Sequence, residues 1–239
     1  MNLKHLMLAI LFFFLAVAPL VLAIVPTGPN KITNLSTVTA PVKSAFKINT
    51  SGGTFTTLLI NVSSQTYRWK AYAGNVTGKI TLDDDRNYTI YDWSLTYVTG
   101  EVYATRSSAL VSWSNIICAN SSTIAREQYY LNVSSKQDDS INKTFFLKAK
   151  NHDAFYVGSK LFNANSCPSI STYVSDLPQQ TKFHEMAMYD GSSTVYATFL
   201  ENKSRGFNNK YYDFQLILPE SGLPGTVSPT SYYFYVEIS

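Results

Sequence analysis

The sequence predicts an all-β protein: a mainly antiparallel β-sandwich of immunoglobulin-like or jelly-roll type with a short helical insert. Apolar and polar residues alternate with a period of two in many short segments, which is typical of half-buried strands. Aromatic residues make up 14% of the chain and charged residues only 15%, which argues against disorder. The alternation is interrupted between about residues 115 and 180, where we expect the insert.

Residues 1–23 have the pattern of a secretory signal peptide. Lys4 and His5 precede a long apolar run, and Ala23 ends a small-residue cleavage pattern. The alternative is an uncleaved anchor, because an apolar stretch of ~20 residues can span a bilayer; Pro19 favours cleavage. The sequence therefore predicts export to the extracellular space or cell surface, with membrane contact only through this segment if it stays uncleaved.

Residues 24–42 predict an extended strap or linker, because several prolines and glycines surround few apolar residues. An amino-terminal strand that docks on a neighbouring subunit is the alternative. Residues 43–239 form the predicted sandwich domain, which includes the insert at about 115–180.

The first predicted strand, residues 55–60, is apolar on both faces and is expected to be buried on both. In residues 67–73 the alternation places Trp69 inward and Tyr72 outward, and Trp93 is also expected inward. The remaining predicted strands follow the same pattern, at 79–82, 91–95, 102–104, 110–115, 145–149, 155–157, 183–188, 194–200, 211–218 and 232–238.

The period changes between residues 120 and 136, where a short helix is predicted. Ser122 or Thr123 is the expected capping residue, and Ser140 is expected to cap a second helical turn.

Cys118 and Cys167 are the only cysteines, and an even count in an exported chain predicts one disulfide. Such a bridge stabilises by about 3–4 kcal/mol in the chain-entropy account. The alternative, a catalytic or metal-binding thiol, lacks a recognisable histidine or cysteine constellation.

Asparagines in Asn-x-Ser/Thr sequons are unusually frequent and predict a glycosylated surface. The alternative is Asn-rich turn chemistry without glycans. The nine sequons begin at Asn34, Asn49, Asn61, Asn75, Asn87, Asn120, Asn132, Asn142 and Asn202.

Asp83, Asp85 and Asn87 have the spacing that opens a calcium-binding loop, and they are the one weak metal candidate. The match fails further on, because Tyr88 and Ser94 stand where such a loop needs glycine and glutamate. A solvated hairpin turn is the preferred interpretation, and no cofactor is predicted.

Recognised catalytic and nucleic-acid-binding patterns do not occur. The net charge is only +3 and the basic residues are scattered, which disfavours nucleic acid as a partner. His184 and Glu185 begin a zinc-protease pattern, but Met188 replaces the second histidine. No serine lies in a nucleophile-elbow motif, so the sequence predicts no enzyme.

Exposed aromatic residues suggest a binding surface instead. Arg68, Lys70, Tyr72, Tyr233 and Tyr235 lie on predicted outward faces, as do Tyr97, Tyr103 and Tyr196. The partners expected are other surface proteins, further copies of the chain, or glycans. The alternative is that another layer covers these faces and the tyrosines pack internally.

Several strings carry a resemblance over nearly the whole chain beyond residue 23, including QTYRWKAYAGNVTG at 65–78, HDAFYVG at 152–158 and YDFQLILPE at 212–220. Together they resemble an uncharacterised family of secreted, mainly archaeal surface-glycoprotein domains. The resemblance implies an extracellular or cell-envelope protein and no enzymatic activity. A structural or interaction protein is therefore the first expectation, an adhesin or glycan-binding domain the second, and a secreted hydrolase the third.

Overall fold

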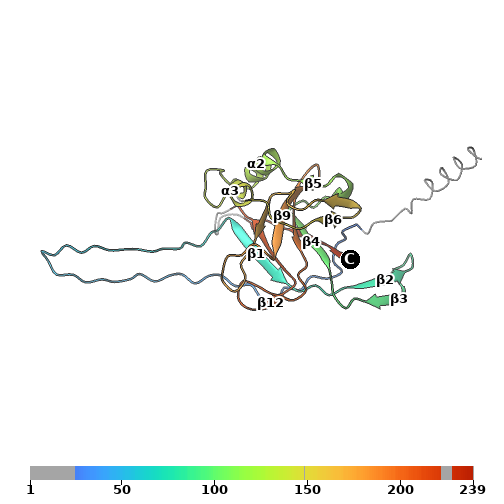
Figure 1. Cartoon of the computed structure of the whole chain (residues 1–239), viewed down its shortest axis with the longest axis horizontal. Helices are drawn as coiled ribbons and strands as arrows, with labels where there is room; N and C mark the ends of the chain where they lie inside the picture. Colours follow the sequence, from blue (N-terminus) through green and yellow to red (C-terminus); the bar gives the residue numbers. More distant parts are fainter. Residues whose placement is uncertain (1–24, 148, 222–227, 239) are drawn as a thin grey trace, which may run out of the picture.

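The computed structural model describes residues 25–147, 149–221 and 228–238, so the predicted signal segment lies outside the described residues. A layered body carries two projections: a long arm at one end and the β2–β3 hairpin at the other (Figure 1). The prediction of an all-β fold with a short helical insert is confirmed, because antiparallel strands dominate.

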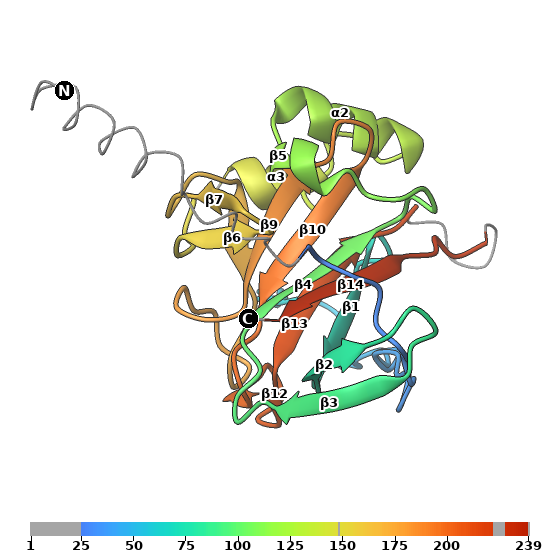
Figure 2. The same ribbon diagram turned by 90° about the vertical axis from the view of Figure 1, so that its right-hand side faces the viewer.

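A six-stranded antiparallel sheet forms the centre of the body. Its strands run in the order β14-β4-β10-β9-β5, and β8 pairs with part of β9. Figure 2 shows this sheet with α2 above it and the β2–β3 hairpin set apart below. The bounds are β4 Gly100–Thr105, β5 Ile117–Cys118, β8 Ser169–Ser171, β9 His184–Tyr189, β10 Thr194–Phe199 and β14 Tyr233–Ile238.

A second, two-stranded sheet pairs β1 (Trp69–Gly74) with β13 (Phe214–Pro219). The smaller elements are β2 Lys79–Asp83, β3 Thr89–Ser94, η1 Trp113–Asn115, α2 Ser121–Tyr130, α3 Ile141–Phe146, β6 Phe155–Val157, β7 Lys160–Phe162, β11 Ser204–Arg205 and β12 Tyr211–Tyr212. Both helices and β6–β8 fall within the predicted insert.

The central sheet is buried on both faces. On one face, Ala104, Ala187 and Tyr196 pack with Leu216 and Leu218 of β13 and with residues of the two helices. On the other face, a second cluster joins the sheet to β6 and β7; it includes Tyr103, Met186, Met188, Val195 and Ala197. Tyr103 and Tyr196 are fully buried, so their predicted outward orientation is wrong. The reason is that each face of their strands is covered by a separate layer.

Both helices begin at polar caps. Asn120, one residue before α2, accepts a hydrogen bond from the Thr123 amide, and Thr123 Oγ1 accepts one from the Asn120 amide. The cap is therefore Asn120 and not Ser122 or Thr123, because only Asn120 has extended backbone at the boundary. Ser140 caps α3 as predicted. The strand predicted at 145–149 is wrong, because Phe145 and Phe146 end α3.

The predicted strand at 110–115 is also wrong, since Trp113–Asn115 form a 3-10 turn. Trp113 is half-buried there and packs between Tyr103 and Tyr235, with ring centroids 5.1 and 5.3 Å away. These aromatic contacts supply the packing that a strand would have provided.

Trp69, the first residue of β1, packs against the core as predicted, with its ring centroid 6.3 Å from that of Phe145. The rest of β1 has the opposite orientation from the prediction. Lys70 and Tyr72 lie opposite Leu218 and Leu216 of β13, so their side chains share the inward face with those buried leucines. Ala71 is exposed instead of buried. The register with β13 determines which face of β1 is covered.

Candidate interaction surfaces

The arm, defined as residues 30–65, is an extended segment that leaves the body and returns. Every residue in it is exposed, and none belongs to a strand. Its two limbs run side by side (Figure 1), where Lys43 Nζ donates a 2.9 Å hydrogen bond to the Ser63 carbonyl. The limbs turn at Gly52 and Gly53, and Gly53 has a positive φ of 78°, which favours glycine.

The arm contains a large amount of exposed apolar surface. The prediction of a strand at 55–60 buried on both faces is therefore wrong, since this segment lies on the returning limb, away from the body. Its large hydrophobic residues are Ile32, Leu35, Val38, Val42, Phe46, Ile48, Phe55, Leu58, Leu59, Ile60 and Val62. Phe55 is 94% exposed and Leu59 99% exposed. The arm carries three lysines and no acidic residue.

Both ends of the arm are attached to the body. Before the arm, Thr27 pairs with Val236 of β14 through two backbone hydrogen bonds of 3.1 and 2.8 Å. After the arm, Thr66 and Arg68 both bind the Asp139 carboxylate, and these hydrogen bonds hold the pKa of Asp139 below its usual value although burial opposes the shift. The strap thus begins on the protein's own sheet and continues into the arm.

Most of the predicted binding surface contacts the body. Arg68 binds Asp139 at 3.1 Å, and Lys70 binds Glu220 at 2.6 Å. Tyr72 packs edge-on against Phe234, with ring centroids 5.2 Å apart, so its predicted outward orientation is wrong. Tyr235 packs against Trp113. Tyr233 is 44% exposed, and it lines an open groove between β14 and the strap, together with Lys31 and Ile32.

The Lys70–Glu220 pair fastens β1 to the segment after β13. Thr230 also donates to the Glu220 carboxylate, and these hydrogen bonds outweigh burial and lower the pKa of Glu220 to about 2. Lys70 therefore has a structural contact in the folded chain.

The β2–β3 hairpin is amphipathic and stands apart from the core. Ile80 lies opposite Trp93, and Leu82 opposite Tyr91, so the four side chains share one face. They are 39%, 48%, 55% and 60% exposed, respectively. The prediction that Trp93 is buried is wrong, because no layer of the described body covers this apolar face.

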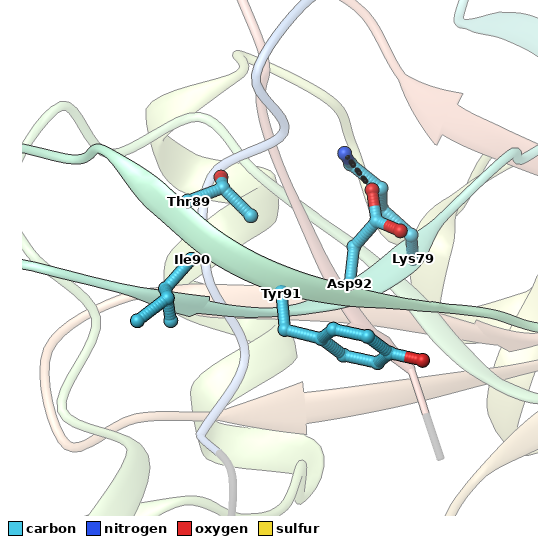
Figure 3. Close-up of a pocket in the computed structure, with 5 residues that line it drawn as sticks. All are labelled: Lys79, Thr89, Ile90, Tyr91 and Asp92. Carbon is cyan, nitrogen blue, oxygen red and sulfur yellow. Dashed lines mark hydrogen bonds and ion pairs between the residues drawn. The ribbon is translucent and has the colours of Figure 1, made fainter.

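The opposite face of the hairpin is polar. Lys79 Nζ lies 2.6 Å from the Asp92 carboxylate, and Figure 3 shows this pair on the side opposite Tyr91. These residues, with Thr89 and Ile90, line a shallow open groove.

The candidate metal residues lie in the turn of this hairpin. Asp83 accepts hydrogen bonds from Thr89 and Thr81, which lower its pKa. Asn87 has a positive φ of 63°, as in a tight turn. Within the described residues, no group of three or more histidine, cysteine, aspartate or glutamate side chains is placed to hold a metal ion. The calcium site stays a prediction without a preformed ligand set.

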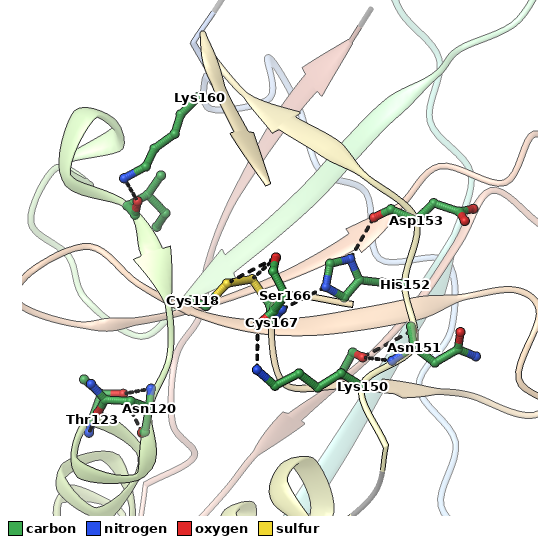
Figure 4. The surroundings of a disulfide bond; sticks show 12 residues. Cys118, Asn120, Thr123, Lys150, Asn151, His152, Asp153, Lys160, Ser166 and Cys167 are labelled. Atoms are coloured by element: carbon green, nitrogen blue, oxygen red, sulfur yellow. Dashed lines mark hydrogen bonds between the residues drawn. A yellow bond between two sulfur atoms is a disulfide. The ribbon is translucent and has the colours of Figure 1, made fainter. Parts of the chain in front are cut away.

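The predicted disulfide is present. Cys118 at the end of β5 is bonded to Cys167 before β8 (Figure 4), and these residues are 49 apart in the sequence. His152 packs beside the bridge. Its Nε2 accepts a 2.9 Å hydrogen bond from the Cys167 amide, and its Nδ1 lies 2.7 Å from the Asp153 carbonyl oxygen. Burial lowers the pKa of His152. This histidine thus supports the bridge.

Ser171 and His184 lie on paired strands, with Ser171 Oγ 3.0 Å from His184 Nδ1. This is a serine–histidine contact that sequence reasoning missed, because the two residues are brought together only by the β8–β9 register. His184 is almost fully buried and packs against Phe199, and neither groove described above contains the pair. The geometry is that of a cross-strand hydrogen bond.

Two glutamates lie opposite each other in the central sheet, which sequence reasoning also missed. Glu101 of β4 pairs with Glu237 of β14, and both are buried. The Glu237 carboxylate accepts hydrogen bonds from Tyr103 at 3.0 Å and from the Gly158 amide at 3.0 Å. Burial and the neighbouring Glu237 raise the pKa of Glu101 to about 8, and burial raises that of Glu237.

The sequon asparagines are accessible. Eight of the nine are exposed and Asn142 is half-buried. Asn87, Asn132 and Asn202 have positive φ, and Asn120 caps α2, so four of the nine also perform local turn or cap chemistry. The positions permit glycosylation and also explain part of the asparagine content.

Fold and surfaces together define an all-β protein with one disulfide and two exposed apolar projections. Comparisons with protein-family models, with curated proteins and with solved structures find no match to this chain. Among the described helices, none is long and apolar enough to cross a membrane. Any functional conclusion therefore depends on the surfaces themselves.

Proposed function

We propose that this chain is a secreted or cell-surface structural protein, without catalytic activity, that associates with other protein chains through its arm. The observation that carries the proposal is the arm itself. Eleven large hydrophobic side chains are exposed on a segment that is attached to the body at both ends. Exposed apolar surface of this extent marks a protein-interaction site.

The energetics favour an arm that is covered in its working state. Each buried Val, Leu, Ile or Phe side chain contributes ~1.5–3 kcal/mol relative to exposure. An extended segment of this kind can add to a sheet or pack on an apolar face of a partner. Ordering the segment costs conformational entropy, which these side chains offset only when a partner removes them from water.

Three features support a surface location. The disulfide is typical of proteins folded in an oxidising compartment. The sequons lie at accessible positions, and a signal-peptide pattern precedes the described residues.

A shortened arm tests the proposal. In the variant, residues 36–61 are replaced by Gly-Ser-Gly-Ser, which leaves both attachment points in place. We expect the full arm to support concentration-dependent association in sedimentation velocity, and the shortened chain to remain monomeric with an unchanged melting temperature. The matched control carries Thr56→Ser and Thr57→Ser on an arm of full length.

Two results would contradict this proposal. One is a wild-type chain that stays monomeric up to millimolar concentration, and the other is a shortened chain that assembles as the wild type does.

Glycan binding is a second candidate, favoured by the exposed aromatic pair on the hairpin. Tyr91 and Trp93 lie edge to face, with ring centroids 4.9 Å apart, and exposed aromatic rings with a polar edge suit sugar stacking. A glycan ligand is expected to change Trp93 fluorescence, and Trp93→Thr to abolish binding on a glycan array. An array with no signal for the wild type would remove this candidate.

A further inference from the structure

The two exposed projections lie at opposite ends of the body (Figure 1). We propose that the apolar face of the β2–β3 hairpin in one copy of this chain is the docking site for the arm of a second copy. This inference rests on the proposed function, because it identifies the partner of the arm and the surface that receives it.

The hairpin has the properties of a receiving surface. An isolated two-stranded hairpin is marginally stable in water and needs a further strand or layer. Here Ile80, Leu82, Tyr91 and Trp93 form a continuous apolar face on one side of the two strands. The strand pairing is regular from Lys79 to Leu82, and the Lys79–Asp92 pair lies on the opposite face, so the hairpin presents a defined apolar strip.

The returning limb of the arm has a matching strip. In an extended chain, Leu58, Ile60 and Val62 point to one side, and Phe55, Leu59 and Asn61 to the other. Asn61 begins a sequon, and a glycan there would occupy the second side. The side with Leu58, Ile60 and Val62, which are 53%, 79% and 77% exposed, is therefore the docking side.

The charges of the two projections are complementary. The arm contains Lys31, Lys43 and Lys47 and no acidic residue, a net charge of +3. Residues 79–94 contain four aspartates against one lysine and one arginine, a net charge of −2. Lys43 bonds to Ser63, so one positive charge lies beside the apolar strip of the limb. Opposite charges orient the encounter and disfavour pairing of two arms.

The arrangement predicts head-to-tail assembly. The arm of a given copy points away from its own hairpin (Figure 1). Each copy therefore offers one arm that can dock and one hairpin face that can receive an arm. Such a heterologous contact closes into a ring or continues as an open chain of copies.

Mixing two defective variants tests the inference. The arm variant carries Leu58→Thr, Ile60→Thr and Val62→Thr. The hairpin variant carries Ile80→Thr and Trp93→Thr. Threonine is chosen because it retains a high propensity for β-strands. Each variant alone is expected to associate at least ~100-fold more weakly than the wild type, given the apolar surface removed. An equimolar mixture is expected to form a two-chain complex and no larger species, because one intact arm meets one intact hairpin.

Charge reversal gives a second measurement. Lys43→Glu with Lys47→Glu is expected to weaken assembly, and Asp85→Lys in the partner copy is expected to restore part of it. Asp85 is chosen because, in the described residues, Asp83 and Asp84 hold the hairpin turn through hydrogen bonds. The control is Ser94→Thr on the hairpin, which leaves the apolar face unchanged.

The outcomes separate this inference from the proposed function. If the hairpin variant assembles like the wild type while the shortened arm abolishes assembly, the arm docks elsewhere and only the inference fails. A mixture that stays monomeric also overturns it. If the shortened arm assembles normally, the proposed function fails as well.

Discussion

Raising the pH from about 4.5 to 8 is expected to lower the free energy of unfolding by on the order of 4 kcal/mol through Glu101 alone. The cause is the buried Glu101–Glu237 pair, in which the pKa of Glu101 is raised to about 8 by burial and by Glu237. Below its unfolded-state pKa, Glu101 is protonated in both states and its contribution is complete. As the pH rises toward 8, the unfolded chain releases this proton while the folded chain must retain it, so stability is lost.

Glu101→Gln isolates this effect. A glutamine keeps the size of the side chain and can donate to the Glu237 carboxylate, and it removes the titration. Urea unfolding at pH 4.5, 6 and 8 should therefore show a decrease smaller than that of the wild type by on the order of 4 kcal/mol. Glu185 and Glu237, whose pKa values burial also raises, account for the remaining slope.

The matched control is Asp85→Asn in the exposed hairpin turn, which should leave the wild-type slope unchanged. An identical slope in the wild type and in Glu101→Gln would rule out this carboxyl pair as the source.

In more acidic solution the pH dependence of stability has the opposite sign. The pKa of Glu220 is lowered to about 2, so its contribution to stability is lost as the pH falls from 4 toward 2. Maximum stability is expected in mildly acidic solution.

Loss of the disulfide is the second large effect. The double variant Cys118→Ala, Cys167→Ala is expected to lose about 3–4 kcal/mol, because the bridge closes a 49-residue separation and restricts the unfolded chain. For a domain of this size the loss corresponds to roughly 6–16 °C in Tm. Thermal unfolding followed by circular dichroism measures it.

Ser166→Ala serves as the control, since Ser166 lies beside both sulfur atoms (Figure 4) and does not form the bridge. A double variant that melts within about 2 °C of the wild type would contradict the prediction. So would alkylation of both cysteines in unreduced wild-type protein after denaturation.

Strand location was largely predictable from the sequence, and burial was not. The alternation at Ile80, Leu82, Tyr91 and Trp93 correctly identified residues that share a face, and β2–β3 pairing confirms it. The alternation in the sequence does not show that this face remains uncovered. Tyr103 is the opposite case: the alternation predicts a solvent-facing side chain, yet a second layer buries it completely. Local periodicity reports which side chains lie together, because it depends only on backbone geometry.

The candidate interaction surfaces also contain features that the sequence predicts and features that it does not. The exposed apolar run at 55–60 has the composition of a core strand, so its position on the arm was not predictable from composition or alternation. The pairs Glu101–Glu237 and Ser171–His184 are far apart in the sequence, and only strand register brings each together. Neither pair has a local signal that could have found it.

The fold class, the disulfide partners and the positions of most strands follow from the amino-acid sequence, because alternation and an even cysteine count are properties of the chain alone. Which faces are covered depends on the tertiary structure, since the covering segments are distant in the sequence. It placed Lys70 and Tyr72 against β13, and left the arm and the hairpin face in water. Burial is a property of the layers that meet, and here two apolar faces meet no layer of the described chain.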